Sequence, residues 1–158
     1  MKNKKGFTVV ELLVTLLIIG IVTSITISFA FGSRHRWDLR GTSREITSYI
    51  QKMRLLAIKE NKNIRMTFSR KSLECKAFDG NEWVDLEYPI HYKIEGKVEI
   101  LNPPDFAFNS QSMLINPNTF QPAGQVQFQL QSPGNVGKKD VITITIYSFG
   151  GLKVEQNF

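Results

Sequence analysis

The sequence has little of what most catalytic sites use, because its 158 residues contain only one cysteine, Cys75, and two histidines, His35 and His91. A single cysteine excludes an intramolecular disulfide, and neither histidine has a carboxylate at the spacing of a metal site. No nucleophile elbow or phosphate loop appears. We therefore expect no enzyme activity, no metal and no cofactor. We interpret Cys75 as a half-buried strand residue rather than a reactive thiol.

The excess of basic residues is confined to the first part of the chain. The formal net charge is +6, and Lys2, Lys4 and Lys5 account for three of these charges. Residues 34–62 have eight basic and three acidic side chains, whereas residues 63–158 have nine basic and ten acidic ones. Because nucleic-acid binding requires a basic face, the nearly neutral distal part argues against a general nucleic-acid binder.

Charge is missing altogether from residues 12–33, a run of 22 residues rich in Leu, Ile and Val. As a helix this run is roughly 33 Å long, enough to cross a bilayer core of about 30 Å. An ordinary secretory signal has a shorter apolar region and a small-residue cleavage site after it, which this sequence matches poorly. A plain membrane anchor explains the length of the run, but it does not explain Glu11.

Glu11 is a carboxylate at the edge of this apolar run. A charged side chain costs about 2.5–3.5 kcal/mol at the centre of a bilayer and less near its edge, so such a residue usually has a partner. No basic side chain follows Glu11 within two helical turns. The nearest cations are Lys4 and Lys5 and, if the chain is cut after Gly6, a new α-amino group on Phe7.

The N-terminal motif resembles the class III leader and N-terminal signature of type IV pilins and type II secretion pseudopilins. It consists of a basic leader followed by Gly6-Phe7-Thr8-Val9-Val10-Glu11 and an unbroken apolar run. The resemblance implies that a prepilin peptidase cuts between Gly6 and Phe7 on the cytoplasmic side and then N-methylates Phe7. It also implies that Glu11 pairs with the Phe7 amine of a neighbouring subunit in a filament. Pairing two charges that are each costly in lipid would offset that cost.

The sequence departs from the resemblance at Ser28, where many pilins have a proline. Thr23, Ser24 and Thr26 precede it, and their hydroxyls can bond carbonyl groups one turn back along a helix. We therefore expect no strong proline-type kink. Trp37, a few residues beyond the apolar run, is expected near the membrane interface.

We predict the type IV pilin fold, an α+β fold in which one long helix packs on an antiparallel β-sheet domain. The leader is residues 1–6, the transmembrane helix residues 7–33, an amphipathic continuation of the helix residues 34–62, and the sheet domain residues 63–158. Asn61-Lys62-Asn63 ends the helix. The apolar residues of the continuation recur at three- and four-residue steps, namely Ile46, Tyr49, Ile50, Met53 and Ala57. Alternating segments predict strands at residues 64–68, 73–78, 82–86, 90–94, 98–101, 112–115, 125–130, 141–149 and 152–155.

Glycine-containing turns and a proline pair separate strands of the predicted sheet domain. Asp79-Gly80-Asn81 and Gly150-Gly151 each predict a tight hairpin, and Trp83 is expected to pack in the sheet. Pro103-Pro104 is interpreted as a loop or a strand edge.

Three short segments are similar to the GspH/FimT-type minor pseudopilins. They are residues 53–61 at the helix end, Thr119-Phe120-Gln121-Pro122-Ala123-Gly124, and residues 148–154. Some FimT-like proteins bind DNA through a basic C-terminal hairpin. The corresponding turn of this chain offers Lys153, with Lys138 and Lys139 upstream of it. The paired arginines of those proteins are missing, so solvated lysines are the simpler interpretation.

The sequence thus predicts a minor pilin or pseudopilin, processed by a prepilin peptidase/N-methyltransferase and anchored in the cytoplasmic (inner) membrane with its sheet domain outside the cytoplasm. Its partners are other pilin or pseudopilin subunits, contacted through the N-terminal helix in a type IV pilus or a type II secretion pseudopilus. Two alternatives remain open. One is a DNA-binding, FimT-like minor pilin of a natural-transformation pilus, with nucleic acid as a less favoured partner. The other is a membrane anchor that does not assemble.

Overall fold

The structure is a computed structural model that describes residues 8–87, 90–133 and 139–157. One helix, α1 (Val9–Glu60), precedes ten strands. The strands are β1 (Ile64–Phe68), β2 (Ser72–Phe78), β3 (Trp83–Asp85), β4 (His91–Lys93), β5 (Glu99–Leu101), β6 (Asp105–Phe108), β7 (Leu114–Ile115), β8 (Gln125–Pro133), β9 (Lys139–Tyr147) and β10 (Leu152–Asn157). By its internal contacts the chain divides into two compact units, Met1–Arg34 and His35–Phe158, each described by itself below.

The first unit contains the apolar part of α1. Val9–Thr26 has a mean hydropathy of 2.4, and none of it is buried against the rest of the protein. Its hydroxyl groups are satisfied within the helix, because Thr23 donates to the Ile19 carbonyl at 2.7 Å and Thr26 to the Val22 carbonyl at 2.8 Å. This confirms the predicted hydroxyl–carbonyl bonds, which let polar side chains sit on an apolar helix at little cost.

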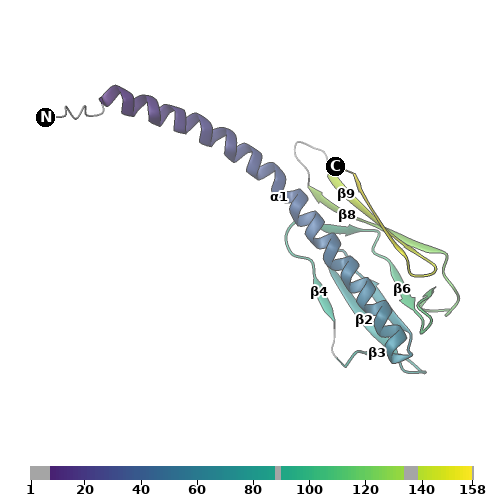
Figure 1. The fold of residues 1–158 in the computed structure, drawn as a ribbon. Coiled ribbons are helices and arrows are strands. Elements are labelled where there is room, and N and C mark those ends of the chain that lie inside the picture. The colour runs from purple at the N-terminus through teal and green to yellow at the C-terminus, as the bar shows by residue number, and fades with distance from the viewer. Residues whose placement is uncertain (1–7, 88–89, 134–138, 158) are drawn as a thin grey trace. The chain divides into compact units, whose positions relative to one another are not determined.

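In the second unit, α1 is amphipathic, as predicted. Its fully buried side chains recur at three-, four- and seven-residue steps, namely Leu39, Ile46, Ile50, Met53 and Ala57. This spacing places them on one face of the helix. Figure 1 shows the second half of α1 running alongside the strands.

The helix ends where the sequence predicted. Asn61 takes the left-handed conformation with φ of 51°, and the Lys62 N–H donates to the Ala57 carbonyl at 3.1 Å. Asn tolerates this conformation better than most residues, and the bond satisfies a carbonyl that the helix leaves open.

The strands form two antiparallel sheets. The first has the order β3-β2-β1-β6-β7 with β4 also paired to β2, and the second has the order β10-β9-β8-β5. The predicted fold class is confirmed. Two sheets form because β5 pairs with the distant β8, placing Ile100 opposite Leu130, whereas the strands before and after it in the chain join the first sheet.

One strand was missed by the sequence analysis. β6 follows the Pro103-Pro104 pair and lies beside β1, with Phe106 opposite Met66. Phe106, Ala107 and Phe108 are all buried, so the strand shows no alternation of apolar and polar residues. Its pairing is therefore a long-range feature that a period-two pattern cannot reveal.

The hydrophobic core lies between the second half of α1 and the two sheets. Every hydrophobic residue of this core falls between Leu39 and Ile146. The rings of Phe68, Phe106 and Phe128 meet at its centre, with Phe68 5.7 Å from Phe106 and 5.1 Å from Phe128. Because the second unit holds the whole of this core, we expect a fragment beginning at residue 35 to fold by itself.

Both predicted glycine hairpins are present. Gly80 has φ of +111°, and the Asp79 carboxylate accepts hydrogen bonds from the Asn81 and Glu82 amides at 2.8 and 2.9 Å. These amides lower the pKa of Asp79. Gly150, with φ of +77°, turns β9 into β10. The left-handed conformation at both positions is one that glycine adopts without steric cost.

Candidate functional site

The candidate site is the start of α1, where Thr8 and Glu11 bind one another. The Thr8 hydroxyl oxygen accepts from the Glu11 N–H at 3.2 Å, and a Glu11 carboxylate oxygen accepts from the Thr8 N–H, also at 3.2 Å. This reciprocal arrangement is a capping box. It satisfies amides that the helix leaves open and places a negative charge at the positive end of the helix dipole.

The sequence analysis missed this partner of Glu11. The signal was present, because Thr-x-x-Glu directly before an apolar run is the pattern of a capping box. We expected a cationic partner for Glu11, whereas the observed donor is the backbone amide of Thr8. Gly6 and Phe7, the predicted cleavage and methylation residues, lie outside the described residues.

The capping box fixes the position of the Glu11 carboxylate. Both of its donors, the Thr8 amide and the Thr8 hydroxyl at 3.3 Å, reach the same oxygen of Glu11, Oε2. The side chain remains exposed, so its other oxygen can accept a further bond. A carboxylate held in this way at the head of an exposed apolar helix is suited to binding a cation that another molecule brings.

The apolar segment that follows Glu11 is long enough and apolar enough to cross a membrane. Its large side chains are exposed all round the helix, from Leu12 at 54% to Ile25 at 55%. A helix that is apolar on every side requires an apolar environment, either lipid or other helices.

The lysines predicted for a DNA-binding hairpin are only partly described. Lys153 is bound to Glu155 at 2.9 Å, and this contact raises the pKa of Lys153. Lys139 begins β9, but its side chain lies outside the description, as does the whole of Lys138. Among the described residues, therefore, no cluster of free lysines forms at this turn.

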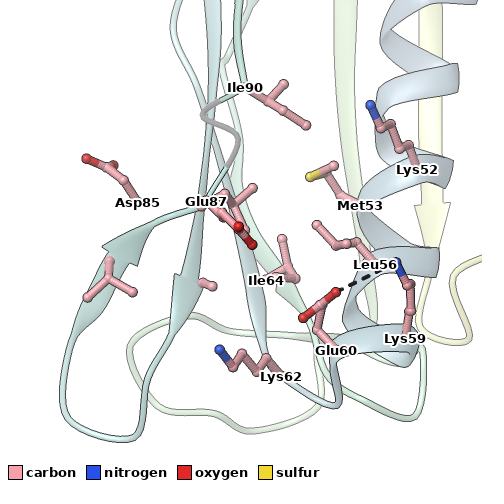
Figure 2. A pocket seen from close by; sticks show the side chains of 13 residues that line it. Lys52, Met53, Leu56, Lys59, Glu60, Lys62, Ile64, Asp85, Glu87 and Ile90 are labelled. Carbon is pink, nitrogen blue, oxygen red and sulfur yellow. Dashed lines mark ion pairs between the residues drawn. The ribbon is translucent and has the colours of Figure 1, made fainter.

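A cavity of about 600 Å³ lies between the end of α1 and strands of the first sheet. Figure 2 shows Met53, Leu56, Ile64 and Ile90 inside it and charged side chains around it. Three lysines and three acidic residues line it, and Lys59 and Glu60 are 4.0 Å apart. The described lining residues include no histidine, cysteine, serine or tyrosine.

Cys75 is buried in β2, and burial raises its pKa to about 12. Cys75 is a strand residue, as predicted, but it is fully buried rather than half-buried, and its raised pKa disfavours the reactive thiolate. Within the described parts of the chain, no three His, Cys, Asp or Glu side chains are grouped so as to hold a metal ion.

Trp83 packs on the first sheet, as predicted. Its ring stacks on Phe120 at 5.8 Å and lies 5.3 Å from Phe78, and the Arg65 guanidinium is 5.7 Å from its centre. Phe120 belongs to the Phe-Gln-Pro-Ala-Gly segment singled out in the sequence. That segment therefore covers part of the sheet through aromatic contacts.

Comparisons with known proteins agree with this architecture. Residues 1–27 match the family described as the prokaryotic N-terminal methylation motif. No curated protein matches the chain. The type IV minor pilin FimU of Pseudomonas aeruginosa (strain PAO1), in its P21 crystal form, is similar in structure, with a TM-score of 0.52 and 15% identity over 76% of this chain and 90% of FimU. Its P65 form gives 0.48 and 14% over 73% and 91%.

The chain is therefore like the type IV pilins in two respects, its N-terminal methylation motif and its fold. Its fold is the type IV pilin fold found in the minor pilin FimU. The methylation motif implies processing by a prepilin peptidase and assembly with other pilins.

Proposed function

We propose that this chain is a minor pilin or pseudopilin, a non-enzymatic structural subunit of a type IV pilus or a type II secretion pseudopilus. One observation carries the proposal. Residues 1–27 match a methylation motif, and Glu11, held by its capping box, lies in the first turn of a helix segment, Val9–Thr26, of which none is buried. Subunits in a filament could bury that surface against one another.

Processing supplies the charge that Glu11 requires. Cleavage between Gly6 and Phe7 creates a new α-amino group, and N-methylation leaves it able to carry a positive charge. This amine and Glu11 of a neighbouring subunit would each be costly in an apolar filament core, and pairing them offsets the cost. The pair also fixes the axial register of one helix against the next.

The proposed topology follows from the basic leader. The positive-inside count alone does not decide the orientation, because Arg34, Arg36, Arg40 and Arg44 follow the apolar run. From the leader motif we infer that the N-terminus lies on the cytoplasmic side of the inner membrane and the second unit outside the cytoplasm. In the filament, the helices form the core and the sheet domain faces outward.

Mass spectrometry of the mature N-terminus tests the processing step. The full chain is expressed with and without a prepilin peptidase. With the enzyme, we expect a chain that begins at methylated Phe7, and Gly6→Val should block cleavage because a branched side chain at the cut obstructs the catalytic cleft. A chain that keeps Met1 in the presence of the enzyme contradicts the proposal.

Substitution of Glu11 tests the assembly step. Glu11→Ala should reduce incorporation into sheared filaments while leaving the amount of membrane-inserted chain unchanged. Glu95→Ala is the matched control, because it removes one exposed carboxylate from the distal domain. Normal incorporation of the Glu11→Ala chain would show that Glu11 does not drive assembly. Absence of the parent chain from sheared filaments would favour the alternative of a membrane anchor that does not assemble.

The weaker candidate is the DNA-binding, FimT-like minor pilin that uses Lys138, Lys139 and Lys153. The ion pair of Lys153 with Glu155 disfavours it, because the Glu155 carboxylate offsets the positive charge that would attract a phosphate. The soluble fragment beginning at residue 35 separates the two functions. Salt-dependent binding to duplex DNA, lost when the three lysines become glutamine, would support the DNA role, and no binding at low salt would remove it.

A further inference from the structure

We propose that the free edge of β10 binds an extended acidic strand of a different protein chain, which adds to the second sheet and lies over the neighbouring face of α1. This inference does not depend on processing or on filament assembly. It rests on an open strand edge and a cationic groove that lie side by side.

The strand edge is open along its length. β10 is the last strand of its sheet and pairs with β9 on one side. The Tyr147 N–H donates to the Gly151 carbonyl at 2.9 Å, which makes this a hydrogen-bonded pair. Hydrogen-bonded and non-hydrogen-bonded pairs alternate along an antiparallel ladder, so the backbone groups of Leu152, Val154 and Gln156 point away from β9. Such a row of donors and acceptors is a template for another strand.

The groove beside this edge is cationic. Its volume is about 340 Å³, with Val154 and Gln156 of β10 on one side and Arg40, Arg44, Thr47 and Gln51 of α1 on the other. The described lining residues include two guanidinium groups and no carboxylate. Arg44 makes no ion pair with any acidic side chain in the part of the chain that the structure describes. The groove therefore suits an anionic ligand.

The strand and the helix run alongside one another. Arg36 binds Asp140 at 3.3 Å near the start of β9, and Arg54 binds the Gly150 carbonyl at 3.1 Å at the turn. Arg36 to Arg54 spans roughly 27 Å of helix, and Asp140 to Tyr147 roughly 24 Å of strand before the turn. In Figure 1 the yellow C-terminal strand returns beside the helix.

The position of α1 beside β10 determines which spacing of carboxylates along a bound strand would fit the groove. Arg40 and Arg44 are one helical turn apart, about 6 Å along the axis. Alternate residues of an extended strand are about 6.8 Å apart and project from the same face. A strand that pairs with β10 and carries carboxylates at alternate positions can therefore place one near each arginine.

The observations favour a peptide over nucleic acid and a different chain over a second copy. A peptide strand can form hydrogen bonds with both the N–H and the C=O groups of the β10 edge. A phosphate backbone has no donors for the C=O groups. The free edge strands that this structure describes, β3, β4, β5, β7 and β10, each carry at most one carboxylate. None of them supplies an alternating acidic pair.

Fluorescence anisotropy tests the inference with the full chain in detergent micelles and a labelled peptide that alternates glutamate with threonine. Val154→Pro removes an outward N–H that β9 does not use, so the fold should survive. Val154→Thr keeps that N–H and is its control. Arg44→Glu reverses the charge in the groove, and Arg70→Glu makes the same change at an exposed arginine that does not line it.

We expect the peptide to bind, and Val154→Pro and Arg44→Glu each to weaken binding about tenfold or more, while the two controls do not. A peptide with N-methylated backbone amides should bind the parent chain as weakly as the unmodified peptide binds the Val154→Pro chain. This comparison tests the strand pairing without altering the protein. Failure of the acidic peptide to bind, or binding that tolerates both the proline and the methylated backbone, would overturn the inference. Two other results would also overturn it. In one, DNA displaces the peptide and its binding depends on Arg44 but not on Val154. In the other, the chain associates with itself and Val154→Pro abolishes this self-association.

Discussion

The guanidinium of Arg54 donates a hydrogen bond to the carbonyl oxygen of Gly150 at 3.1 Å, joining the helix to the turn between β9 and β10. The same guanidinium donates to the hydroxyl of Ser112, which is buried and has φ of 68°. One helix side chain thus holds two connections of the domain, one before β7 and one before β10. Gly150 is glycine because the approach is too close for a side chain. A Cβ there would lie 2.6 Å from Arg54 Nε and 2.9 Å from the Ser112 carbonyl oxygen.

Gly150→Ala should destabilise the domain more than Gly96→Ala does. Both glycines have positive φ, +77° and +72°, so both substitutions carry the left-handed penalty of about 1–2 kcal/mol. Gly96 has open space where its Cβ would lie, and Gly150 does not. We expect Gly150→Ala to lower the free energy of unfolding by about 1 kcal/mol or more beyond Gly96→Ala. Urea unfolding of the fragment beginning at residue 35 measures this, and equal losses would contradict it.

Arg54→Ala should cost about 1–3 kcal/mol, because it leaves the Gly150 carbonyl and the buried Ser112 hydroxyl without their donor. Lys52→Ala is the matched control: Lys52 is an exposed cation on the same helix and should change the stability by less than about 0.5 kcal/mol. The urea midpoint should fall in the first variant at unchanged m-value. If both variants behave alike, Arg54 does not hold the two connections together.

Stability should fall at alkaline pH because of Cys75. Burial raises its pKa from 9.0 to about 12, so the folded chain keeps the thiol proton when the unfolded chain has lost it. This contribution is complete below pH 9 and is lost progressively as pH rises toward 12, by at most about 1.4 kcal/mol per pH unit. Tyr92, whose pKa is also raised by burial and by Glu45, adds a loss of its own only above its ordinary value of 10.0.

The window between pH 9 and pH 10 therefore isolates the thiol. Cys75→Ala should be less stable than the parent chain at pH 7, because it leaves a small cavity. Its stability should then change little between pH 9 and pH 10, whereas that of the parent chain falls. A parallel decline in both chains would show that other groups cause the alkaline loss.

The sequence predicted those parts of the fold whose signals are local. The helix end at Asn61 and the turns at Gly80 and Gly150 follow from residues that tolerate positive φ. The strand β6 and the separation of β5 into the second sheet depend on partners far along the chain, and no local period encodes them. The Arg54–Gly150 contact is of the same kind. At the candidate site, Glu11 stood out as a charge beside an apolar run. Its partner Thr8 was detectable only from the local Thr-x-x-Glu pattern, because the donor is a neutral backbone amide and not a cation.

Trp37 should lie in the headgroup region of the membrane. Its side chain is 71% exposed in the isolated chain. It follows the uncharged run by four residues, about 6 Å along the helix, which is roughly the thickness of the interfacial layer on one side of a bilayer. In vesicles with brominated acyl chains, a Trp83→Phe chain that keeps only Trp37 should be quenched. A Trp37→Phe chain that keeps only Trp83 is the control, since Trp83 packs among Phe78 and Phe120 and should be quenched far less.

Substitutions at Thr8 and Glu11 distinguish the capping of the helix from the pairing of charges between subunits. Thr8→Val removes the hydroxyl that accepts from the Glu11 amide, so that amide should exchange its hydrogen faster in micelles, by a factor that corresponds to about 1 kcal/mol. Thr8→Ser keeps the hydroxyl and should behave like the parent chain. Glu11→Gln keeps an oxygen that can accept from the Thr8 amide but has no charge. It should therefore keep slow exchange yet lose incorporation into filaments. If the Glu11→Gln chain assembles normally, the carboxylate serves the helix start and not a neighbouring amine.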